Sequence, residues 1–456
     1  MTPTRELNEH PLALLNRGRK VCLEVFGCQM NKLDGELILG QFQQAGYEVT
    51  EDRDQADVFL VHTCSVREHA EDRVLGRLGA MKRQKQHNPD LVLGVVGCMA
   101  QRDQDLIAKR LPHVDIICGT REFPKLPFLV SDVRESGNPV VAVSSDEDVV
   151  VDNTIRVRSN PFQAFVTVVR GCNKRCAFCI VPKVRGPEVS RPQAEIVDEV
   201  KSLVDQGTIE VTLLGQTVNH YGSDLDDGSN LVSLIRELHA IQDLKRIRFI
   251  TSYPRSFPDD LIRCMGELDK VTHHLHMPLQ HGSDRILKKM RRGYTVAQYM
   301  DRVEAVKRLA PQVEIASDFI VGYCTETDED FEATCRSIPE IEFMNSYIFK
   351  YSVRPDTPSA GFDDDVPEPI KKERNQRLLE IQKEVSLKVN RRYLGQTLEV
   401  LAEGVTKHDV NRWMGRARTQ HIVTFQKGVV LAGEMVQVRI DDCTPLALYG
   451  TIVGRS

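Results

Sequence analysis

Arg170-Gly171-Cys172-Asn173-Lys174-Arg175-Cys176-Ala177-Phe178-Cys179 carries three thiols at C-x3-C-x2-C spacing, directly after an apolar run that predicts a β-strand. Three thiolates this close can bind one face of a metal centre and leave one metal corner open. The polar residues between them indicate a turn that stabilises thiolates, although burial as small apolar side chains is the simpler alternative. Zinc fits less well, because the next fifteen residues contain no Cys or His to complete a structural site. A [4Fe-4S] cluster with one iron free of protein ligands fits better.

Length and composition set the frame around this loop. A chain of 456 residues predicts two to four domains. Its 60 Lys and Arg against 65 Asp and Glu exclude a globally basic protein, so any nucleic-acid surface is local. The first twenty residues are too charged for a signal peptide, and no apolar run reaches membrane-spanning length. Twelve Cys without a secretory signal favour metal or redox chemistry in a reducing cytoplasm, and we expect a cytoplasmic protein without a membrane partner.

Residues 20–135 predict an N-terminal doubly wound parallel α/β domain. Short apolar runs at 21–26, 57–62, 91–96 and 114–117 alternate with helical patterns at 34–45, 66–86 and 101–110. Cys28, Cys64 and Cys98 each follow one of the first three strands. Because the ends of parallel strands share one sheet edge, where such folds bind ligands, the three thiols can converge on one centre. Three unrelated buried thiols are the alternative, but Gly27 and Gly97 would let backbone approach a bulky group.

Residues 136–160 are rich in Ser, Asp, Glu, Gly and Pro and predict a linker, or a small hairpin formed by 140–143 and 149–151. Residues 161–390 then contain six predicted strands, at 164–169, 209–214, 246–252, 272–277, 313–321 and 346–351. Helical patterns lie between them at 193–205, 231–241, 259–267, 296–309 and 328–338. This alternation predicts a parallel, partly closed (β/α)6 barrel with the tri-Cys loop after its first strand.

Polar side chains follow the next strands of this barrel, where functional groups gather in such folds. They are Gln216 and Asn219, Ser252 and Arg255, and Gln280 and Ser283. Helix caps and turn formers are the alternative for each of them.

Residues 391–456, after a long charged helix at 367–393, predict a small antiparallel β-barrel. The pattern alternates at 397–402, 421–425, 434–440 and 447–453, with nine Lys and Arg against six Asp and Glu. Arg412, Arg416 and Arg418 surround Trp413, the single Trp of the chain. Such a group suits phosphates and a stacked base, and a solvated loop with Trp413 packed inward is the alternative.

From Val21 onward the chain resembles the radical S-adenosylmethionine methylthiotransferases, and within them the MiaB type that acts on tRNA. The stretches that carry the resemblance are Gly27-Cys28-Gln29-Met30-Asn31, His62-Thr63-Cys64-Ser65-Val66-Arg67-Glu68, Gly97-Cys98-Met99-Ala100-Gln101, the tri-Cys loop with Arg185-Gly186-Pro187-Glu188-Val189-Ser190-Arg191-Pro192, Leu214-Gly215-Gln216-Thr217-Val218-Asn219, and Gln280-His281-Gly282-Ser283-Asp284-Arg285-Ile286-Leu287. The resemblance implies an N-terminal methylthiotransferase domain, a radical S-adenosylmethionine barrel and a C-terminal TRAM domain that binds RNA.

The resemblance also implies the site residues and the chemistry. Cys172, Cys176 and Cys179 would hold one [4Fe-4S] cluster, and Cys28, Cys64 and Cys98 a second. Two S-adenosylmethionine molecules would serve the reaction, one giving a methyl group to sulfur and one giving the radical that opens C2 of N6-isopentenyladenosine beside the anticodon. We expect Gln216, Ser252 and Gln280 at the cofactor. Substrate contacts are expected from Asn31 and Arg185 and from the C-terminal residues Arg412, Trp413, Arg416 and Arg418.

Protein donors of electrons and of sulfur are implied as partners beside tRNA. Threonylcarbamoyladenosine in tRNA and an aspartate of a ribosomal protein are the alternative substrates, and a non-catalytic iron-sulfur RNA-binding sensor is the alternative of another class. One loop departs from the family pattern: Tyr323-Cys324-Thr325-Glu326-Thr327 stands where Phe-Pro-Gly-Glu-Thr is usual, which leaves the cofactor geometry at that strand end open.

Overall fold

The computed structural model describes residues 13, 15–64, 68–144, 155–407, 409–426, 428 and 430–455. The chain divides into two compact units. The first consists of Met1–Asn160, Arg170–Asn173 and Ile180–Glu188, and the second of Pro161–Val169, Lys174–Cys179 and Val189–Ser456. The tri-Cys loop therefore contributes residues to both units, which the predicted boundary at residue 160 did not anticipate.

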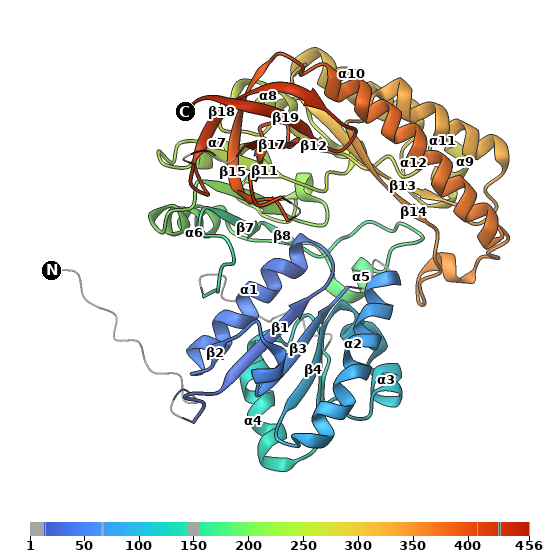
Figure 1. Cartoon of the computed structure of the whole chain (residues 1–456). Helices are drawn as coiled ribbons and strands as arrows, with labels where there is room; N and C mark the ends of the chain where they lie inside the picture. Colours follow the sequence, from blue (N-terminus) through green and yellow to red (C-terminus); the bar gives the residue numbers. More distant parts are fainter. Residues whose placement is uncertain are drawn as a thin grey trace. The chain divides into compact units, whose positions relative to one another are not determined.

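The first unit is built on one six-stranded parallel sheet in the order β2-β1-β3-β4-β5-β6. Its strands are β1 (Lys20–Val25), β2 (Glu48–Val49), β3 (Val58–Thr63), β4 (Val92–Gly97), β5 (Ile116–Cys118) and β6 (Val140–Ala142). Its main helices are α1 (Gln29–Gln44), α2 (Glu68–His87), α3 (Cys98–Arg110) and α4 (Leu126–Ser136), with the short α5 (Val181–Arg185). The helices cover both faces of the sheet (Figure 1). The predicted doubly wound α/β domain is confirmed.

These helices pack against the two faces of the sheet and form two apolar cores with it. Ile38 and Phe42 of α1 pack with Leu126 of α4 on one face, whereas Val74 of α2 packs with Ile107 of α3 on the other. Two details differ from the sequence prediction. Helix α1 begins directly after Cys28, earlier than the predicted 34–45. Strand β6 lies inside the segment predicted as linker or hairpin, and it pairs in parallel with β5 to complete the sheet. The other half of that hairpin, 149–151, lies outside the described residues.

All six predicted barrel strands are present in the second unit. They are β7 (Gln163–Thr167), β10 (Glu210–Leu214), β11 (Arg246–Phe249), β12 (His274–His276), β13 (Glu314–Val321) and β14 (Asn345–Lys350). They pair in parallel as β7-β10-β11 and as β12-β13-β14, and the bridge between Ile247 and Val271 links the two groups. Two short strands, β8 (Val169–Arg170) and β9 (Val189–Ser190), flank the segment that carries the tri-Cys loop.

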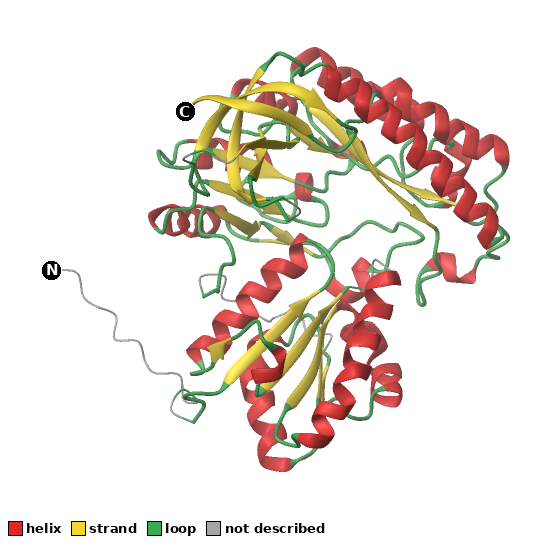
Figure 2. Cartoon of the chain, in the orientation of Figure 1, coloured by secondary structure: helices red, strands yellow, loops and turns green. Residues whose placement is uncertain are grey.

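Helices surround these barrel strands (Figure 2). They are α6 (Gln193–Asp205), α7 (Leu231–His239), α8 (Asp259–Glu267), α9 (Asp284–Lys289), α10 (Val296–Leu309), α11 (Asp328–Ile341) and α12 (Glu368–Arg391). Side chains at alternate strand positions, such as Val166, Val211 and Leu275, join one apolar core with the helices. Because this period-two pattern turns the remaining positions inward, the barrel interior receives mostly polar residues.

The C-terminal part of the same unit is a closed five-stranded barrel in the order β15-β16-β17-β19-β18. Its strands are β15 (Thr397–Val405), β16 (Arg412–Ala417), β17 (Ile422–Gln426), β18 (Met435–Cys443) and β19 (Leu448–Arg455). Four of these were predicted. The fifth, β16, was not predicted as a strand, and it carries Arg412, Trp413 and Arg416 of the predicted basic cluster. Within the described residues, no helix has the length and apolar character that crossing a bilayer requires.

Candidate active site

The tri-Cys loop starts at a glycine whose backbone shape excludes a side chain. Gly171 has φ of +73°, and a Cβ at this position would lie 1.7 Å from the carbonyl oxygen of Pro187. The next amide, that of Cys172, donates a hydrogen bond to the carbonyl of Gly186 at 3.0 Å. The backbone of Cys172 is therefore held by the chain segment that follows the loop. Cys172 is 9% exposed.

The other two thiols lie in one tight turn. The amide of Cys179 donates to the carbonyl of Cys176 at 3.2 Å. Ala177, between them, donates to the carbonyl of Met290 at 2.9 Å and accepts from the amide of Ser359 at 2.8 Å. Cys176 is buried and Cys179 is partly exposed. These backbone bonds fix the turn from both sides.

A buried arginine contacts the middle thiol of this loop. Nη1 of Arg292 lies 3.2 Å from Sγ of Cys176, and Arg292 is 7% exposed. Its Nε donates to the hydroxyl of Tyr294 at 2.9 Å, and the ring of Tyr253 lies 5.2 Å from the guanidinium carbon. A cation beside a thiol favours the thiolate, the form that binds metal.

The second set of thiols, the cysteine trio Cys28, Cys64 and Cys98, follows the neighbouring strands β1, β3 and β4. Cys28 is the N-cap of α1 and Cys98 the first residue of α3, positions where the helix dipole favours thiolates. At Gly27, with φ of +122°, a Cβ would lie 2.6 Å from Cβ of Cys64. The strand ends carrying these thiols therefore meet, as predicted, at the point of the sheet where the strand order reverses.

Two polar side chains tie the trio's loops together. Oγ1 of Thr63 donates to the carbonyl of Val96 at 2.9 Å and accepts from the amide of Met99 at 3.1 Å. The amide group of Asn31 donates to the carbonyls of Phe26 and Thr63 at 2.8 and 2.9 Å. Because Asn31 is 1% exposed and these bonds use its donors, the structure gives it a supporting role here. Its predicted contact with the substrate stays a prediction.

Arg185, also predicted to contact the substrate, lies beside the trio. Its Nη2 donates to Oδ1 of Asn31 at 3.0 Å and to Oδ2 of Asp34 at 2.8 Å, and its side chain is 9% exposed. The same guanidinium hydrogen-bonds the Cys98 thiol and opposes the effect of burial, which raises the pKa of that thiol. Arg185 is therefore a buried cation against two of the three cysteine loops, and its contact with substrate stays a prediction.

The partners of Arg185 carry opposite or no charge. Burial acts to raise the pKa of Asp34, but Arg185 and then His62 more than offset it, so the pKa falls below its usual range. Burial lowers the pKa of His62 to about 4, and its ring lies 3.7 Å from Asp34. At neutral pH the group formed by Arg185, Asp34 and His62 thus contains one ion pair and one neutral imidazole.

Both cysteine sets have the donor chemistry of iron-sulfur ligands. None of the twelve cysteines forms a disulfide. Within the described part of the chain, no group of three His, Cys, Asp or Glu side chains is arranged to hold a single metal ion. In a [4Fe-4S] cluster each thiolate binds a different iron, so the thiols stand apart around the group. The six cysteines therefore fit two clusters, and their assignment as ligands stays a prediction.

The polar residues predicted at the cofactor lie at the carboxyl ends of the barrel strands. Oε1 of Gln216, after β10, and Oγ of Ser252, after β11, are buried and have no hydrogen-bond partner among the described residues. Leaving such an atom unpaired costs about 1–3 kcal/mol, so a ligand that pairs with them is favoured. Gln280, after β12, has φ of +75° and joins β13 through its backbone, donating to Asp318 at 2.9 Å. These strand ends fit a polar cofactor such as S-adenosylmethionine.

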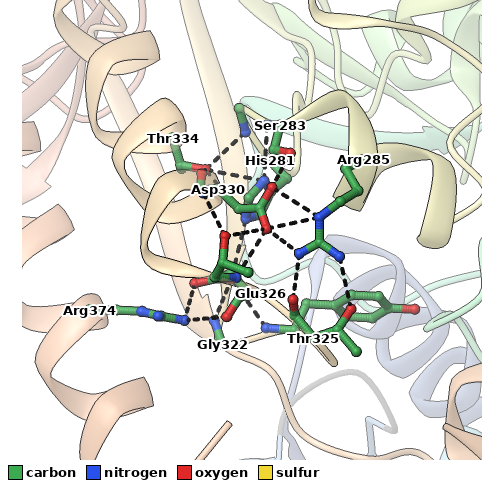
Figure 3. A network of polar contacts seen from close by, with 12 residues as sticks. His281, Ser283, Arg285, Gly322, Thr325, Glu326, Asp330, Thr334 and Arg374 are labelled. Atoms are coloured by element: carbon green, nitrogen blue, oxygen red, sulfur yellow. Dashed lines mark hydrogen bonds and ion pairs between the residues drawn. The ribbon is translucent and has the colours of Figure 1, made fainter. Parts of the chain in front are cut away.

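A network of polar contacts holds the loop after β13 (Figure 3). Oε2 of Glu326 accepts from the amides of Gly322 and Tyr323 at 2.7 and 3.2 Å, and lies 3.2 Å from Nε2 of His281. Its Oε1 accepts from Nη1 of Arg374 at 2.9 Å. The side chains of His281 and Glu326 are fully buried. One carboxylate therefore fixes the backbone at the end of β13 and joins it to the loop after β12 and to α12.

The departure from the family pattern lies in this same loop. Thr325, in place of the usual glycine, has φ of +66°, a conformation that β-branched residues rarely adopt. Its amide donates to Asp365 at 2.6 Å, and its hydroxyl accepts from Lys289 at 2.8 Å and from Arg285 at 3.3 Å. Arg285 also pairs with Asp330 of α11 (Figure 3). The loop thus keeps the backbone shape that glycine would allow, and side-chain contacts hold it there.

The residues of the predicted basic cluster lie in different environments. Within β16, side chains alternate between the barrel core and the outside. Trp413 points into the barrel core and is 9% exposed, so the inward alternative applies and the structure does not support base stacking by Trp413. Arg418 donates to backbone carbonyls of Asp269 and Val271 in the central barrel. Arg416 bonds the carbonyl of Gln420 at 3.2 Å.

Arg412 is the most exposed member of the group. Its side chain is 45% exposed, and its guanidinium carbon lies 5.8 Å from the ring centre of Tyr449. This pair on β16 and β19 offers the cation and aromatic surface that the sequence assigned to Trp413. Because no strand was predicted at 412–417, the alternation that puts Arg412 outside and Trp413 inside the barrel was missed.

Three residues with a clear part in these sites were not predicted. Asp34 lies one turn beyond Asn31 on α1, so helical spacing from Cys28 could have indicated it. Arg292 meets Cys176, and Glu326 meets His281 and Arg374, only in the folded barrel, and no local pattern marks these contacts.

Three family models match the chain. They are the Uncharacterized protein family UPF0004 over residues 20–119, the Radical SAM superfamily over 166–338 and the TRAM domain over 391–453. Among solved structures, a radical S-adenosylmethionine methyltransferase, TsrM, from Kitasatospora setae is similar in fold, with a TM-score of 0.55 over 85% of this chain and 79% of that one. At 14% sequence identity this likeness concerns the fold alone.

Curated relatives match almost from end to end. The chain is 42% identical to the tRNA-2-methylthio-N(6)-dimethylallyladenosine synthase of Clostridium botulinum strain Okra, over 94% of this chain and 96% of the relative. It is 43% identical to the enzyme of the same name from Moorella thermoacetica, over 94% and 97%. The corresponding enzyme of Acetivibrio thermocellus is 43% identical over 98% and 94%.

Proposed function

The chain belongs to the family of tRNA-2-methylthio-N(6)-dimethylallyladenosine synthases, which are radical S-adenosylmethionine enzymes, and we propose that it methylthiolates C2 of N6-isopentenyladenosine beside the anticodon of tRNA. The reaction consumes two molecules of S-adenosylmethionine for each modified base. One donates a methyl group and the other yields 5′-deoxyadenosine and methionine. The enzyme uses two [4Fe-4S] clusters.

The cysteine trio is the observation that supports this proposal most. A hydrogen-abstracting enzyme needs only the tri-Cys loop, whereas a sulfur-inserting enzyme needs a second centre from which sulfur is taken. In this chain Gly27 brings the strand ends of Cys28 and Cys64 into contact. Thr63 then joins this edge to the loop of Cys98.

The bound groups supply what amino-acid side chains cannot: an electron that cleaves S-adenosylmethionine, and a sulfur atom. The chain's own residues bind and orient. Gln216 and Ser252 offer buried polar atoms to the cofactor. Glu326 fixes the amides of Gly322 and Tyr323 at the neighbouring strand end. Side chains of the barrel interior keep water from the reacting base.

The C-terminal barrel supplies the RNA contacts in this proposal. Arg412 over the ring of Tyr449 suits a phosphate with a stacked base, and Arg416 on the same outward face adds charge. A base in an anticodon loop is reached without opening a duplex. Protein donors of electrons and of sulfur complete the cycle. A chain whose twelve cysteines form no disulfide and whose substrate is tRNA works in a reducing cytoplasm.

Nucleoside analysis of tRNA tests the substrate. In cells lacking this protein, isopentenyladenosine without the methylthio group accumulates, and the wild-type gene restores the modified base. A Cys28, Cys64 and Cys98 triple Ala variant does not restore it. Cys443→Ser does, because this thiol on β18 belongs to neither set. Persistence of the methylthio base in the deletion contradicts the proposal. Loss of the methylthio form of threonylcarbamoyladenosine, or of a modified ribosomal aspartate, identifies the alternative substrates.

Iron analysis tests the two centres and separates the enzyme from an RNA-binding sensor with one cluster. After anaerobic reconstitution the protein binds about eight irons, and either triple Ala variant about four. A wild-type value near four contradicts the two-cluster reaction. The ratio of S-adenosylhomocysteine to 5′-deoxyadenosine formed with tRNA, expected near unity, checks the use of two S-adenosylmethionine molecules independently.

A further inference from the structure

Each cysteine set has one buried arginine against a thiol. Arg292 places Nη1 3.2 Å from Sγ of Cys176 and is 7% exposed. Arg185, with a side chain that is 9% exposed, donates to Oδ1 of Asn31 at 3.0 Å, and the Cys28 thiol lies 3.6 Å from the same oxygen. Because Arg keeps its positive charge in any protein environment, these are two fixed charges at two predicted metal centres.

The two arginines differ in what balances their charge. Arg185 is paired with the buried carboxylate of Asp34 at 2.8 Å. The net charge of this pair is zero. The field of Arg185 at the trio is therefore reduced by a negative charge immediately behind it.

Arg292 has no such partner. Its other hydrogen bonds go to the hydroxyl of Tyr294 at 2.9 Å and the carbonyl of Pro278 at 3.3 Å, and two tyrosine rings flank it. Among the described residues no carboxylate forms an ion pair with it. A buried, unbalanced cation is expensive, so its retention indicates that an anion completes the site. A [4Fe-4S] core held by three thiolates is an anion, and its reduction adds one further negative charge.

We propose that Arg292 and Arg185 are the counter-charges of the two predicted clusters and set their reduction potentials separately. Arg292, unbalanced, stabilises the reduced state of the tri-Cys cluster strongly. Arg185, balanced by Asp34, stabilises the reduced state of the trio's cluster less. The enzyme thereby favours electron entry at the cluster that starts the radical, while the sulfur-bearing cluster stays oxidised. This inference rests on the proposed function, since it needs both clusters.

Reduction potentials measured one cluster at a time test this assignment. A Cys28, Cys64 and Cys98 triple Ala background isolates the tri-Cys cluster, and a Cys172, Cys176 and Cys179 triple Ala background isolates the other. In each, Arg292→Gln and Arg185→Gln are compared by potentiometric titration monitored by electron paramagnetic resonance, with iron content measured on every sample. The two arginines serve as matched controls for each other.

Arg292→Gln is expected to lower the potential of the tri-Cys cluster by at least a tenfold change in the reduced-to-oxidised ratio, about 59 mV for one electron. It leaves the trio's cluster unchanged. Arg185→Gln shows the reverse selectivity with a smaller shift. Asp34→Asn moves the trio's cluster the opposite way, to a higher potential, because it removes the balancing charge. If Arg185 and Asp34 had a purely structural role, their substitutions would not shift the reduction potential in opposite directions.

Lys substitutions cover the case in which a Gln variant fails to hold iron. Arg292→Lys and Arg185→Lys keep the charge, so the potential is expected to stay near the wild-type value. Unchanged potentials in the Gln variants at full iron content overturn the proposal, as do equal shifts at both clusters. Potentials that fall in the Lys variants as far as in the Gln variants also overturn it. A wild-type iron count near four refutes the proposed function instead, so the two failures are distinguishable.

Discussion

Removing the guanidinium of Arg374 leaves the buried carboxylate of Glu326 without its cation. In the structure Nη1 of Arg374 donates to Oε1 of Glu326 at 2.9 Å, and neither side chain is more than 8% exposed. The same arginine also pairs with Asp328 at 2.7 Å, but that carboxylate is 91% exposed. We expect Arg374→Ala to loosen the loop after β13, where Glu326 holds two backbone amides.

Burial decides which of the two pairs matters. Breaking a buried ion pair by removing one partner costs about 3–5 kcal/mol, whereas an exposed pair contributes about 0–1 kcal/mol. Glu326 keeps its bonds to Gly322 and Tyr323 and its contact with His281, which favours the lower value. We therefore expect the local opening free energy of this loop to fall by about 3 kcal/mol in Arg374→Ala. At 1.4 kcal/mol for each factor of ten, this is about two orders of magnitude in the open population.

Amide hydrogen exchange at Gly322 and Tyr323 measures this opening directly. Exchange is expected to accelerate roughly a hundredfold in Arg374→Ala, by the free energy above. Asp328→Asn, the matched control, leaves it nearly unchanged. The double variant Glu326→Gln with Arg374→Ala exchanges more slowly than the sum of the single effects predicts, since no buried charge is left unpaired. Equal acceleration in Asp328→Asn and Arg374→Ala, or none in either, refutes the reasoning.

Three further predictions concern the loop and the C-terminal barrel. Thr325→Gly binds S-adenosylmethionine at least as well as the wild type and opens less readily than Thr325→Ala by about 0.5–1 kcal/mol in hydrogen exchange, because glycine adopts its positive φ without strain. Burial lowers the pKa of His421 to about 4 from 6.5, so its imidazole takes up a proton on unfolding; its own contribution to stability is present above pH 6.5 and falls by about 3 kcal/mol as pH drops to 4. Urea unfolding followed by Trp fluorescence measures the total loss, to which His273 and His274 also contribute because burial lowers the pKa of each. His421→Phe removes its share of the loss, while the exposed control His87→Gln leaves the whole loss. Arg412→Ala weakens tRNA binding and reduces its salt slope by about 1, whereas Arg418→Ala, which removes bonds to the central barrel, lowers the unfolding midpoint; the opposite assignment of effects contradicts the structure.

Elements with a strong local period were predicted well. The helices at 193–205, 259–267 and 296–309 have the predicted bounds, because amphipathic spacing and capping residues such as Thr295 act within one turn. All six barrel strands and the order of alternation were also predicted. In the first unit, the predicted parallel strands β1, β3 and β4 placed their ends at one edge of the sheet, and this was enough to bring Cys28, Cys64 and Cys98 together.

Elements without such a signal were missed or misread. Strand β6 has three residues and owes its existence to pairing with β5, so its surroundings of Ser, Gly and Pro predicted a linker. Strand β16 carries Arg412, Trp413 and Arg416, and Arg418 follows its end; their charge concealed its alternation. The same omission affected the predicted RNA site. Trp413 and Arg418 were predicted to contact RNA, whereas Trp413 packs inward and Arg418 binds the central barrel.

Charge compensation explains why the buried groups around the cysteines could not be predicted. A sequence shows Arg185 and Arg292 as two ordinary cations, each in a polar stretch typical of a solvated surface. Whether such a charge is tolerable in the interior depends on a partner that is distant in sequence: Asp34 for Arg185, and the Cys176 thiol for Arg292. The thiols determine where metal can bind, but the long-range pairing of charge determines how each metal centre differs from the other. Two cysteine sets with the same ligand type can therefore perform different tasks in one chain.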